Sequence, residues 1–318
     1  MHAGARVPFY NTTMTRILLL YYSQSGEAGR VAETLAAALR DPDVDLSLVR
    51  LRPKQEYPFP WRSVGRFFAA LPECHLGPLP ELATPGFDPD QKFDLVILVY
   101  QVWFLTPSLP VQAFLKSGHA RVLRNSRVMT VSVSRNMWHS ASEMMIRLLA
   151  VAGARHIDNV AVTHQGPAWA TFITTPRALL FGKKDRFWGI FPPAGLDEKE
   201  LDRVARFGKA ILERQGRLHQ PDAIPLLTGL GAVSINRRYL VPELIGWYWF
   251  RGWAHLIRFL GRLGTVPRMA SVYLFVVFLL FMIVVVMPLT MLARLLLHPF
   301  IHKRLAEYAR RLQQPSGQ

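Results

Sequence analysis

The feature that most constrains the fold is a short polar turn between an apolar run and an amphipathic run near the start of the chain. Residues 16–22 (RILLLYY) have the continuous apolar character of a strand that is buried on both faces. Residues 30–39 place Val31, Leu35 and Leu39 at helical spacing. A strand followed directly by a helix predicts a βα unit of a parallel sheet.

The turn itself, residues 22–29 (YSQSGEAG), has the composition of an anion cradle. Small residues leave backbone N–H groups unobstructed, and a helix N-terminus favours negative charge, so phosphate is the expected guest. The alternative is that Ser23, Ser25 and Glu27 only cap the helix. The turn has neither the Lys-Ser/Thr of nucleotide triphosphatases nor the G-x-G-x-x-G of dinucleotide folds.

Four further strand-like runs follow, with helices expected at 110–116 and 140–153. The runs are LSLVRL (46–51), FDLVILVY (93–100), RVMTVSVS (127–134) and NVAVT (159–163). Strands that alternate with helices predict an α/β fold with a doubly wound, five-stranded parallel sheet of order 2-1-3-4-5. Such sheets bind ligands at the carboxyl ends of their strands, so the loops after strands 1, 3 and 4 are the candidate site.

The loops after strands 3 and 4 are rich in aromatic residues. Aromatic side chains exposed at loop tips are costly unless a flat ligand covers them, so we expect exposed aromatics there that flank a ring. The alternatives are that Trp103 and Phe104 are core residues beneath a lid, that Trp138 packs on the next helix, and that Arg135 is solvated. The candidate residues are Trp103, Phe104 and Thr106 in one loop and Arg135, Asn136, Met137 and Trp138 in the other.

A second constraint lies near the end of the chain, where 25 uncharged residues separate Arg268 from Arg294. As a helix rising ~1.5 Å per residue, this segment is long enough to cross a ~30 Å hydrocarbon core. Both flanks are positive, so the positive-inside rule does not decide the orientation. A re-entrant hairpin that turns near Pro288, with both ends in the cytoplasm, stays open, as does a buried core helix.

Residues 242–264 mix tryptophan and tyrosine with arginine, which predicts a helix in the headgroup layer, or alternatively an ordinary surface helix. The formal net charge is +16, and residues 161–318 hold 21 Lys and Arg against 9 Asp and Glu, whereas residues 1–160 hold 17 against 13. A basic excess beside an apolar segment favours an anionic membrane, and no nucleic-acid recognition motif is present.

The sequence predicts five regions and a reducing compartment. A single cysteine, Cys74, excludes an internal disulfide framework and a multi-thiolate metal site, and no metal site is expected. No secretory signal is recognisable, so we expect the protein on the cytoplasmic face of the inner (plasma) membrane. The regions are a flexible extension (1–13), an α/β domain with a C-terminal elaboration (14–216), a basic aromatic interfacial region (217–268), a membrane segment (269–293) and a basic tail (294–318).

Several stretches together resemble a known family. The polar turn resembles the flavodoxin phosphate loop S/T-x-S/T-G-x-S/T, with Ala28 at its last hydroxyl position. The WF…P-V-x-x-F-L pattern of residues 103–115 resembles flavodoxins and NAD(P)H-quinone reductases. Residues 16–255 resemble the flavodoxin-like dialkylresorcinol condensing enzymes, through EYPFPW (56–61), YQVWFLTPSLP (100–110), SRNMW (134–138) and GKKDRFWGIFPPAG (182–195).

This resemblance implies a flavodoxin-like fold that binds FMN, with NAD(P)H as a further candidate cofactor and a homodimer as a candidate assembly. The aromatic loops after strands 3 and 4 would contact the flavin. The phosphate would be held by Ser23, Gln24, Ser25, Gly26, Glu27, Ala28 and Gly29.

The residues favour redox chemistry over condensation. Cys74 and His75 are adjacent in a proline-flanked loop, and adjacency does not orient a base onto a thiol. The resemblance then implies a membrane-attached FMN oxidoreductase that aromatises a cyclohexanedione-type ring or reduces a quinone-type, lipid-like ring, with His139 and His164 as candidate bases. The expected partners are that hydrophobic ring substrate or quinone and membrane lipid, with no nucleic acid. The alternatives are a membrane-tethered flavodoxin electron carrier and a non-catalytic scaffold.

Lys183, Lys184 and Arg186 form a basic turn within the distinctive 182–195 stretch. They are candidates for contacting the phosphate of NAD(P)H, a carrier-protein surface or lipid headgroups. The alternative is a solvated basic turn.

Overall fold

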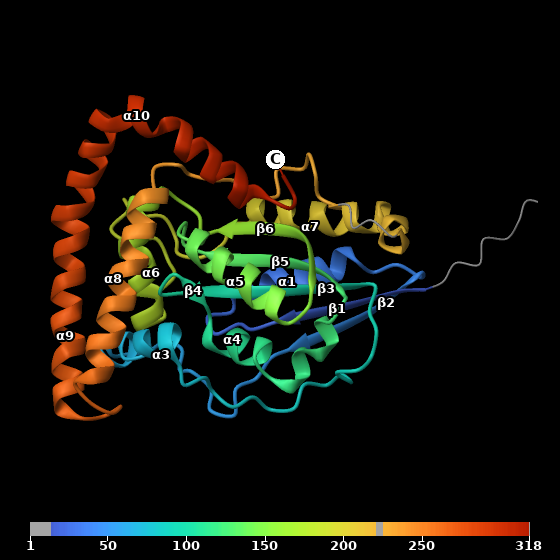
Figure 1. Ribbon diagram of the computed structural model, residues 1–318, viewed down its shortest axis with the longest axis horizontal. Helices are drawn as coiled ribbons and strands as arrows, with labels where there is room; N and C mark the ends of the chain where they lie inside the picture. The colour runs from blue at the N-terminus through green and yellow to red at the C-terminus, as the bar shows by residue number, and fades with distance from the viewer. Residues whose placement is uncertain (1–13, 221–224, 318) are drawn as a thin grey trace, which may run out of the picture.

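The computed structural model describes residues 14–220 and 225–317 (Figure 1). The extension predicted at 1–13 lies outside the described residues. The fold is built on a sheet of order β2-β1-β3-β5-β6, in which all neighbouring strands are parallel. The strands are β1 (Thr15–Tyr21), β2 (Val44–Arg50), β3 (Leu95–Trp103), β5 (Arg127–Ser134) and β6 (Arg155–Thr163).

This sheet confirms the predicted doubly wound order 2-1-3-4-5. The sequence analysis missed a sixth strand, the two-residue β4 (Thr106–Pro107), which pairs antiparallel with the end of β3. Continuous apolar runs produce the central strands because helices cover both faces of the sheet. Residues 95–100 of β3 are all buried.

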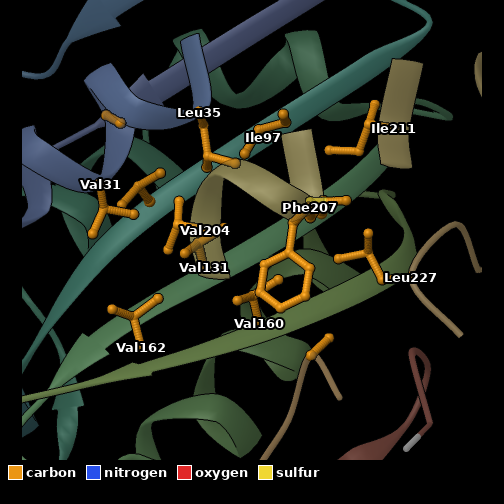
Figure 2. Packing of buried hydrophobic residues seen from close by; sticks show 14 of the residues in the cluster. Val31, Leu35, Ile97, Val131, Val160, Val162, Val204, Phe207, Ile211 and Leu227 are labelled. Atoms are coloured by element: carbon orange, nitrogen blue, oxygen red, sulfur yellow. The ribbon is translucent and has the colours of Figure 1, made fainter. Parts of the chain in front are cut away.

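Helices α1 (Glu27–Ala38) and α7 (Glu198–Glu213) cover one face of the sheet. Figure 2 shows Val31 and Leu35 of α1 and Phe207 of α7 packed against side chains of the central strands, including Val131. Helices α4 (Leu109–Leu115) and α5 (His139–Val151) cover the other face, together with the 3-10 helix η1 (Gly118–Leu123). The domain is therefore a three-layer α/β/α structure.

Most of the remaining helices lie beyond the carboxyl edge of the sheet, on the side of β4 (Figure 1). The connection between β2 and β3 contains α2 (Val64–Phe68) and α3 (Leu71–Leu76). After β6 come α6 (Ala168–Phe181), α7, η2 (Gln215–His219), α8 (Leu240–Phe259), α9 (Val266–Phe281), the π-helical turn η3 (Met282–Val286) and α10 (Met287–Gln313). α8 and α9 run side by side, and α10 bends back toward the sheet.

One helical run among the described residues, Val266–Thr290, is long and apolar enough to cross a membrane by length and composition. Most of this run is exposed. The basic stretch predicted at 294–318 contains the second part of α10, and its end packs on the domain. Ala309 and Leu312 are buried against Leu240 of α8.

Candidate functional site

The first βα turn has the geometry of an open helix N-terminus. Gly26, which precedes α1, has a left-handed backbone (φ 92°) that glycine adopts without strain. The first-turn amides of α1 have no intrahelical acceptor, as at any helix N-terminus. Ser23 lies close to the start of the helix, because a β-carbon built at Gly29 would be in van der Waals contact with its hydroxyl at 3.5 Å.

Gln101, at the end of β3, bridges two residues of this turn. Its side-chain oxygen accepts the Gln24 amide at 3.1 Å, and its side-chain nitrogen donates to the Ser25 hydroxyl at 3.1 Å. The sequence analysis did not select Gln101. The sequence pattern could have identified it, because it is a polar residue at the carboxyl end of an otherwise apolar strand.

The distinctive 182–196 segment closes over the same turn. The Lys184 ammonium donates to the Ser25 carbonyl at 2.9 Å and to the Glu27 carboxylate at 2.5 Å, and the Leu196 amide donates to that carboxylate at 3.0 Å. Burial by itself would raise the pKa of Glu27, but the hydrogen bonds from Lys184 and Leu196 hold it below its ordinary value. The turn is therefore lined by an ion pair in which the Glu27 carboxylate is buried and the Lys184 side chain is 37% exposed.

His164, which follows β6, lies close to this ion pair. Burial is the largest cause that lowers its pKa to about 4, Glu27 opposes the shift, and the charges of Arg135 and Lys184 add to it. Its imidazole is therefore neutral at pH 7. Arg135, in the β5 loop, lies over the Phe172 ring at 4.0 Å, and burial lowers its pKa to about 10, which leaves it charged.

The expectation that aromatic residues are exposed at the loop tips is wrong. Trp138 is 2% exposed and belongs to the core under α7. Trp103 packs edge-on against Tyr22 and Tyr57, with ring centroids 5.8 and 5.0 Å apart. Phe104 packs on Phe67, Phe68 and Phe250. These aromatics have the protein's own rings as partners because the 57–68 connection and α8 lie over the carboxyl edge.

The other loop residues adopt strained or internal positions. Phe104 and Leu105 have φ values of 47° and 63°, and Asn136 has φ 134°, conformations that non-glycine residues avoid unless the surroundings impose them. The Thr106 hydroxyl is buried and donates to the Trp103 carbonyl at 2.9 Å. Met137 is half-buried, with its sulfur 4.0 Å from the Arg135 guanidinium.

His139 forms a fully buried pair with a residue that sequence reasoning did not find. Its Nδ1 lies 2.5 Å from the Glu243 carboxylate, and the second oxygen of that carboxylate accepts the Ser140 amide at 2.8 Å. The side chains of His139 and Glu243 are 2% and 1% exposed. Glu243 lies on α8, 104 residues away in the sequence, so no local pattern relates the two.

Five of the fourteen buried polar atoms that lack a hydrogen-bond partner among the described residues lie in the segments that follow β1, β5 and β6. A hydrogen-bonding group left unsatisfied inside a protein is costly, so such groups are candidate contacts for a polar ligand. Within the described residues, the unpartnered atoms directly after β1, β5 and β6 are Tyr22 Oη, Ser23 Oγ, Asn136 Nδ2, His139 Nε2 and His164 Nδ1.

Cys74 does not have the environment of a nucleophile. It is fully buried on α3, and burial together with neighbouring Glu73 raises the pKa of its thiol well above the ordinary value. His75 turns its Nε2 to the Phe104 carbonyl at 3.0 Å. Burial is also the largest cause that lowers the pKa of His75, to about 4. A thiol that stays protonated cannot serve as the nucleophile of a condensation.

No family model and no curated protein sequence matches the chain. Among solved structures, the FMN complex of a flavoprotein from Lactobacillus acidophilus NCFM covers 46% of this chain and 93% of its own, with 21% identity and a TM-score of 0.39. A flavodoxin, WrbA-like protein from Agrobacterium tumefaciens covers 65% and 99%, with 13% identity and a TM-score of 0.34. A flavone reductase covers 65% of each chain, with 11% identity and a TM-score of 0.36.

At these identities and TM-scores the likeness concerns the fold and carries no argument about activity. The fold is flavodoxin-like by its own strand order and connections.

Proposed function

We propose that this chain is an FMN-dependent oxidoreductase that works at a membrane surface on a hydrophobic ring of the cyclohexanedione or quinone type. The observation that carries the proposal is the set of unpartnered polar atoms at the carboxyl edge, beside a turn with the form of a flavin phosphate loop. A polar ligand in this place would satisfy groups that the protein itself leaves without partners.

The first βα turn fits a phosphate monoester. Ser23 Oγ is buried without a partner, and the Glu27 carboxylate accepts from Lys184 and Leu196 rather than from the first amides of α1. Lys184 has three N–H donors, of which the Ser25 carbonyl and Glu27 use two, so one is free for a phosphate oxygen. This cation would compensate for Ala28, which has no hydroxyl. The Gln101 amide would have to release Gln24 and Ser25.

The ring of the cofactor would lie at the carboxyl edge of the sheet, with Asn136 and His164 as unpartnered polar groups beside it. When bound, a flavin supplies hydride transfer. The chain's own residues supply orientation and proton transfer. Of the two candidate bases, His164 is the weaker, because its pKa of about 4 leaves little affinity for a proton at neutral pH.

His139 is the better candidate base because a carboxylate orients it. If its Nδ1 carries the proton and donates to Glu243, its Nε2 lone pair is free to accept a substrate proton, and Nε2 is the atom without a partner. Glu243 would stabilise the imidazolium that results. The burial of His139 requires that the edge opens for substrate to enter, and α8, which carries Glu243, is the element that must move.

A second candidate function rests on the same turn. Gln101 already binds the Gln24 amide and the Ser25 hydroxyl that a phosphate would contact, so the chain also suits a scaffold that keeps the fold without the cofactor. A visible spectrum distinguishes the oxidoreductase from the scaffold, after the protein is purified in detergent and reconstituted with FMN. Flavin absorption that remains after desalting supports the oxidoreductase, and a colourless protein with no quenching of FMN fluorescence supports the scaffold.

If FMN binds, anaerobic mixing with NAD(P)H, followed by a quinone or a cyclohexanedione, identifies the electron donor and the substrate class. His139→Gln should then lose turnover and retain FMN, because the proposed base is not part of the phosphate cradle.

A further inference from the structure

The α9 helix is apolar all round, and the protein covers only one of its faces. Val272 and Phe275 are fully buried against Leu71 and Ile257. The opposite face is a continuous apolar stripe, and an uncovered stripe of this size marks an interaction surface. Its side chains are exposed by 52% to 70% of their surface and consist of Tyr273, Leu274, Val277, Leu280, Phe281 and Val284.

α9 lies along α8 rather than away from the domain (Figure 1). Phe275 and Phe278 of α9 pack against the Trp253 ring of α8, with ring centroids 5.6 and 5.2 Å apart. At its start, α9 is fixed by Arg268, which donates to the Glu73 carboxylate at 2.6 Å and to the Ala69 carbonyl. The axis and position of α9 are therefore fixed by the water-soluble domain.

The far end of the helical pair returns to the same domain. Ser316, three residues after α10, is fully buried beside β6. Its hydroxyl donates to Asp158 at 2.8 Å, and the Asn159 amide donates to that hydroxyl at 2.7 Å. Asp158 also accepts the amides of Leu226 and Leu227. We call this set of contacts the C-terminal clasp.

We propose that the α9–α10 pair is a monotopic hairpin. α9 lies in the plane of one leaflet of an anionic phospholipid membrane with its apolar stripe inserted, and both ends of the pair stay on the side of the α/β domain. A spanning arrangement would carry α8 into the hydrocarbon core beside α9. Arg251, Arg258 and Arg262 would then lie in the hydrocarbon core, where a charged arginine is strongly unfavourable.

In the in-plane arrangement, these arginines lie at the membrane surface instead. Exposed cations on α8 and just after it, beside exposed Tyr248 and Trp249, suit the headgroup layer of an anionic bilayer. The C-terminal clasp also excludes a single crossing, because a helix that crosses the bilayer once would deliver Ser316 to the opposite side from Asp158.

The inference rests on the membrane part of the proposed function and not on FMN. The chain suits a labelling experiment because its one cysteine, Cys74, is buried and gives little background. Three variants each add one cysteine. They are Leu280→Cys in the apolar stripe, Gln314→Cys near the clasp, and Val151→Cys at the last residue of α5. Val151 is 87% exposed and serves as the control for an exposed apolar position outside the stripe.

Membranes from expressing cells are prepared as right-side-out and as inside-out vesicles and treated with a membrane-impermeant maleimide. We expect Gln314→Cys and Val151→Cys to label in the same vesicle orientation, and Leu280→Cys to lose labelling in both until detergent is added. Labelling of Gln314→Cys and Val151→Cys in opposite orientations would overturn the hairpin and leave membrane attachment intact.

A flotation assay with phosphatidylglycerol-containing liposomes tests membrane attachment separately from the hairpin. Purified wild-type protein should float with these liposomes. Protein that stays at the bottom of the gradient and forms dimers cross-linked through Leu280→Cys would overturn both the membrane attachment and the hairpin, and would assign the stripe to a second copy of the chain.

Discussion

Replacing Lys184 by methionine should weaken FMN binding and leave riboflavin binding nearly unchanged. Riboflavin has the same ring but no phosphate, so a cation that acts on the phosphate affects only FMN. Methionine keeps most of the length and apolar stem of lysine and removes the charge. Lys183, exposed on the same segment, provides the matched control as Lys183→Met.

The expected magnitude follows from the position of Lys184. A hydrogen bond to a charged group contributes ~1.5–3 kcal/mol. The Lys184 side chain is 37% exposed, so solvent screening places the effect toward the lower end of that range. A loss of ~1.5–2 kcal/mol corresponds to a ~10- to 30-fold increase in the Kd for FMN.

Glu27 complicates the single variant, because removing Lys184 leaves a carboxylate that is 4% exposed without its main partner. That carboxylate would repel phosphate and add to the loss. The double variant Glu27→Gln/Lys184→Met removes both charges, and it should bind FMN more tightly than Lys184→Met alone while remaining weaker than the wild type.

The assay is quenching of flavin fluorescence on titration with protein, for FMN and riboflavin in parallel. Equal weakening of both ligands by Lys184→Met would refute the phosphate role and reduce Lys184 to a structural residue. A wild type that binds neither ligand would refute the flavin proposal itself.

Three further predictions concern stability, measured by guanidinium unfolding. Glu243→Ala should lower the free energy of unfolding by ~3 kcal/mol, because it leaves a buried histidine and a helix N-terminal amide without their acceptor, and Glu243→Gln should cost less. Gly208→Ala should cost ~1–3 kcal/mol, since its β-carbon would lie 2.5 Å from α1, whereas Gly216→Ala, with nothing within 4 Å, should not destabilise. Burial is the main cause that raises the pKa of Asp158 to about 6 from 3.8, so the folded state binds this proton more tightly than the unfolded state. This contribution to stability is complete below about pH 4 and is lost as pH rises through about 6, by up to ~3 kcal/mol, and Asp158→Asn should remove that dependence.

The fold was predictable because its central strands are buried on both faces. That burial requires continuous apolar runs, and β5 coincides with the predicted 127–134. Elements that depend on tertiary contacts were not found. The sequence analysis placed no helix over α6, where Pro176 interrupts the pattern, and the backbone of α6 is fixed partly by the amide of Trp61, which donates to the Leu179 carbonyl.

The location of the candidate site could be predicted from the sequence, but only some of its residues could. The carboxyl edge follows from the topology alone, which is why Ser23, Asn136 and His164 were selected before their unpartnered atoms were known. The pairing of His139 with Glu243 was not predictable, because it joins the first residue of α5 to a helix that the sequence assigned to the membrane interface.

The state of the aromatic loops was mispredicted for a related reason. Trp103, Phe104 and Trp138 were expected to need a flat ligand, but the cover that they need comes from the 57–68 connection, α8 and the core under α7. A tryptophan at a loop tip indicates that something flat or apolar covers it. It does not indicate whether that cover is a ligand or another part of the same chain.

The distribution of unpartnered atoms separates these two interpretations of the carboxyl edge. If the edge were only a packing surface, apolar side chains of similar volume could replace its polar groups at little cost, whereas each buried polar group without a partner costs ~1–3 kcal/mol. Instead, Ser23, Asn136 and His164, in the segments that follow β1, β5 and β6, and His139, at the start of α5, each have a buried polar atom without a partner. Such a cost is borne by a site that binds a polar ligand, and this favours the oxidoreductase over the scaffold.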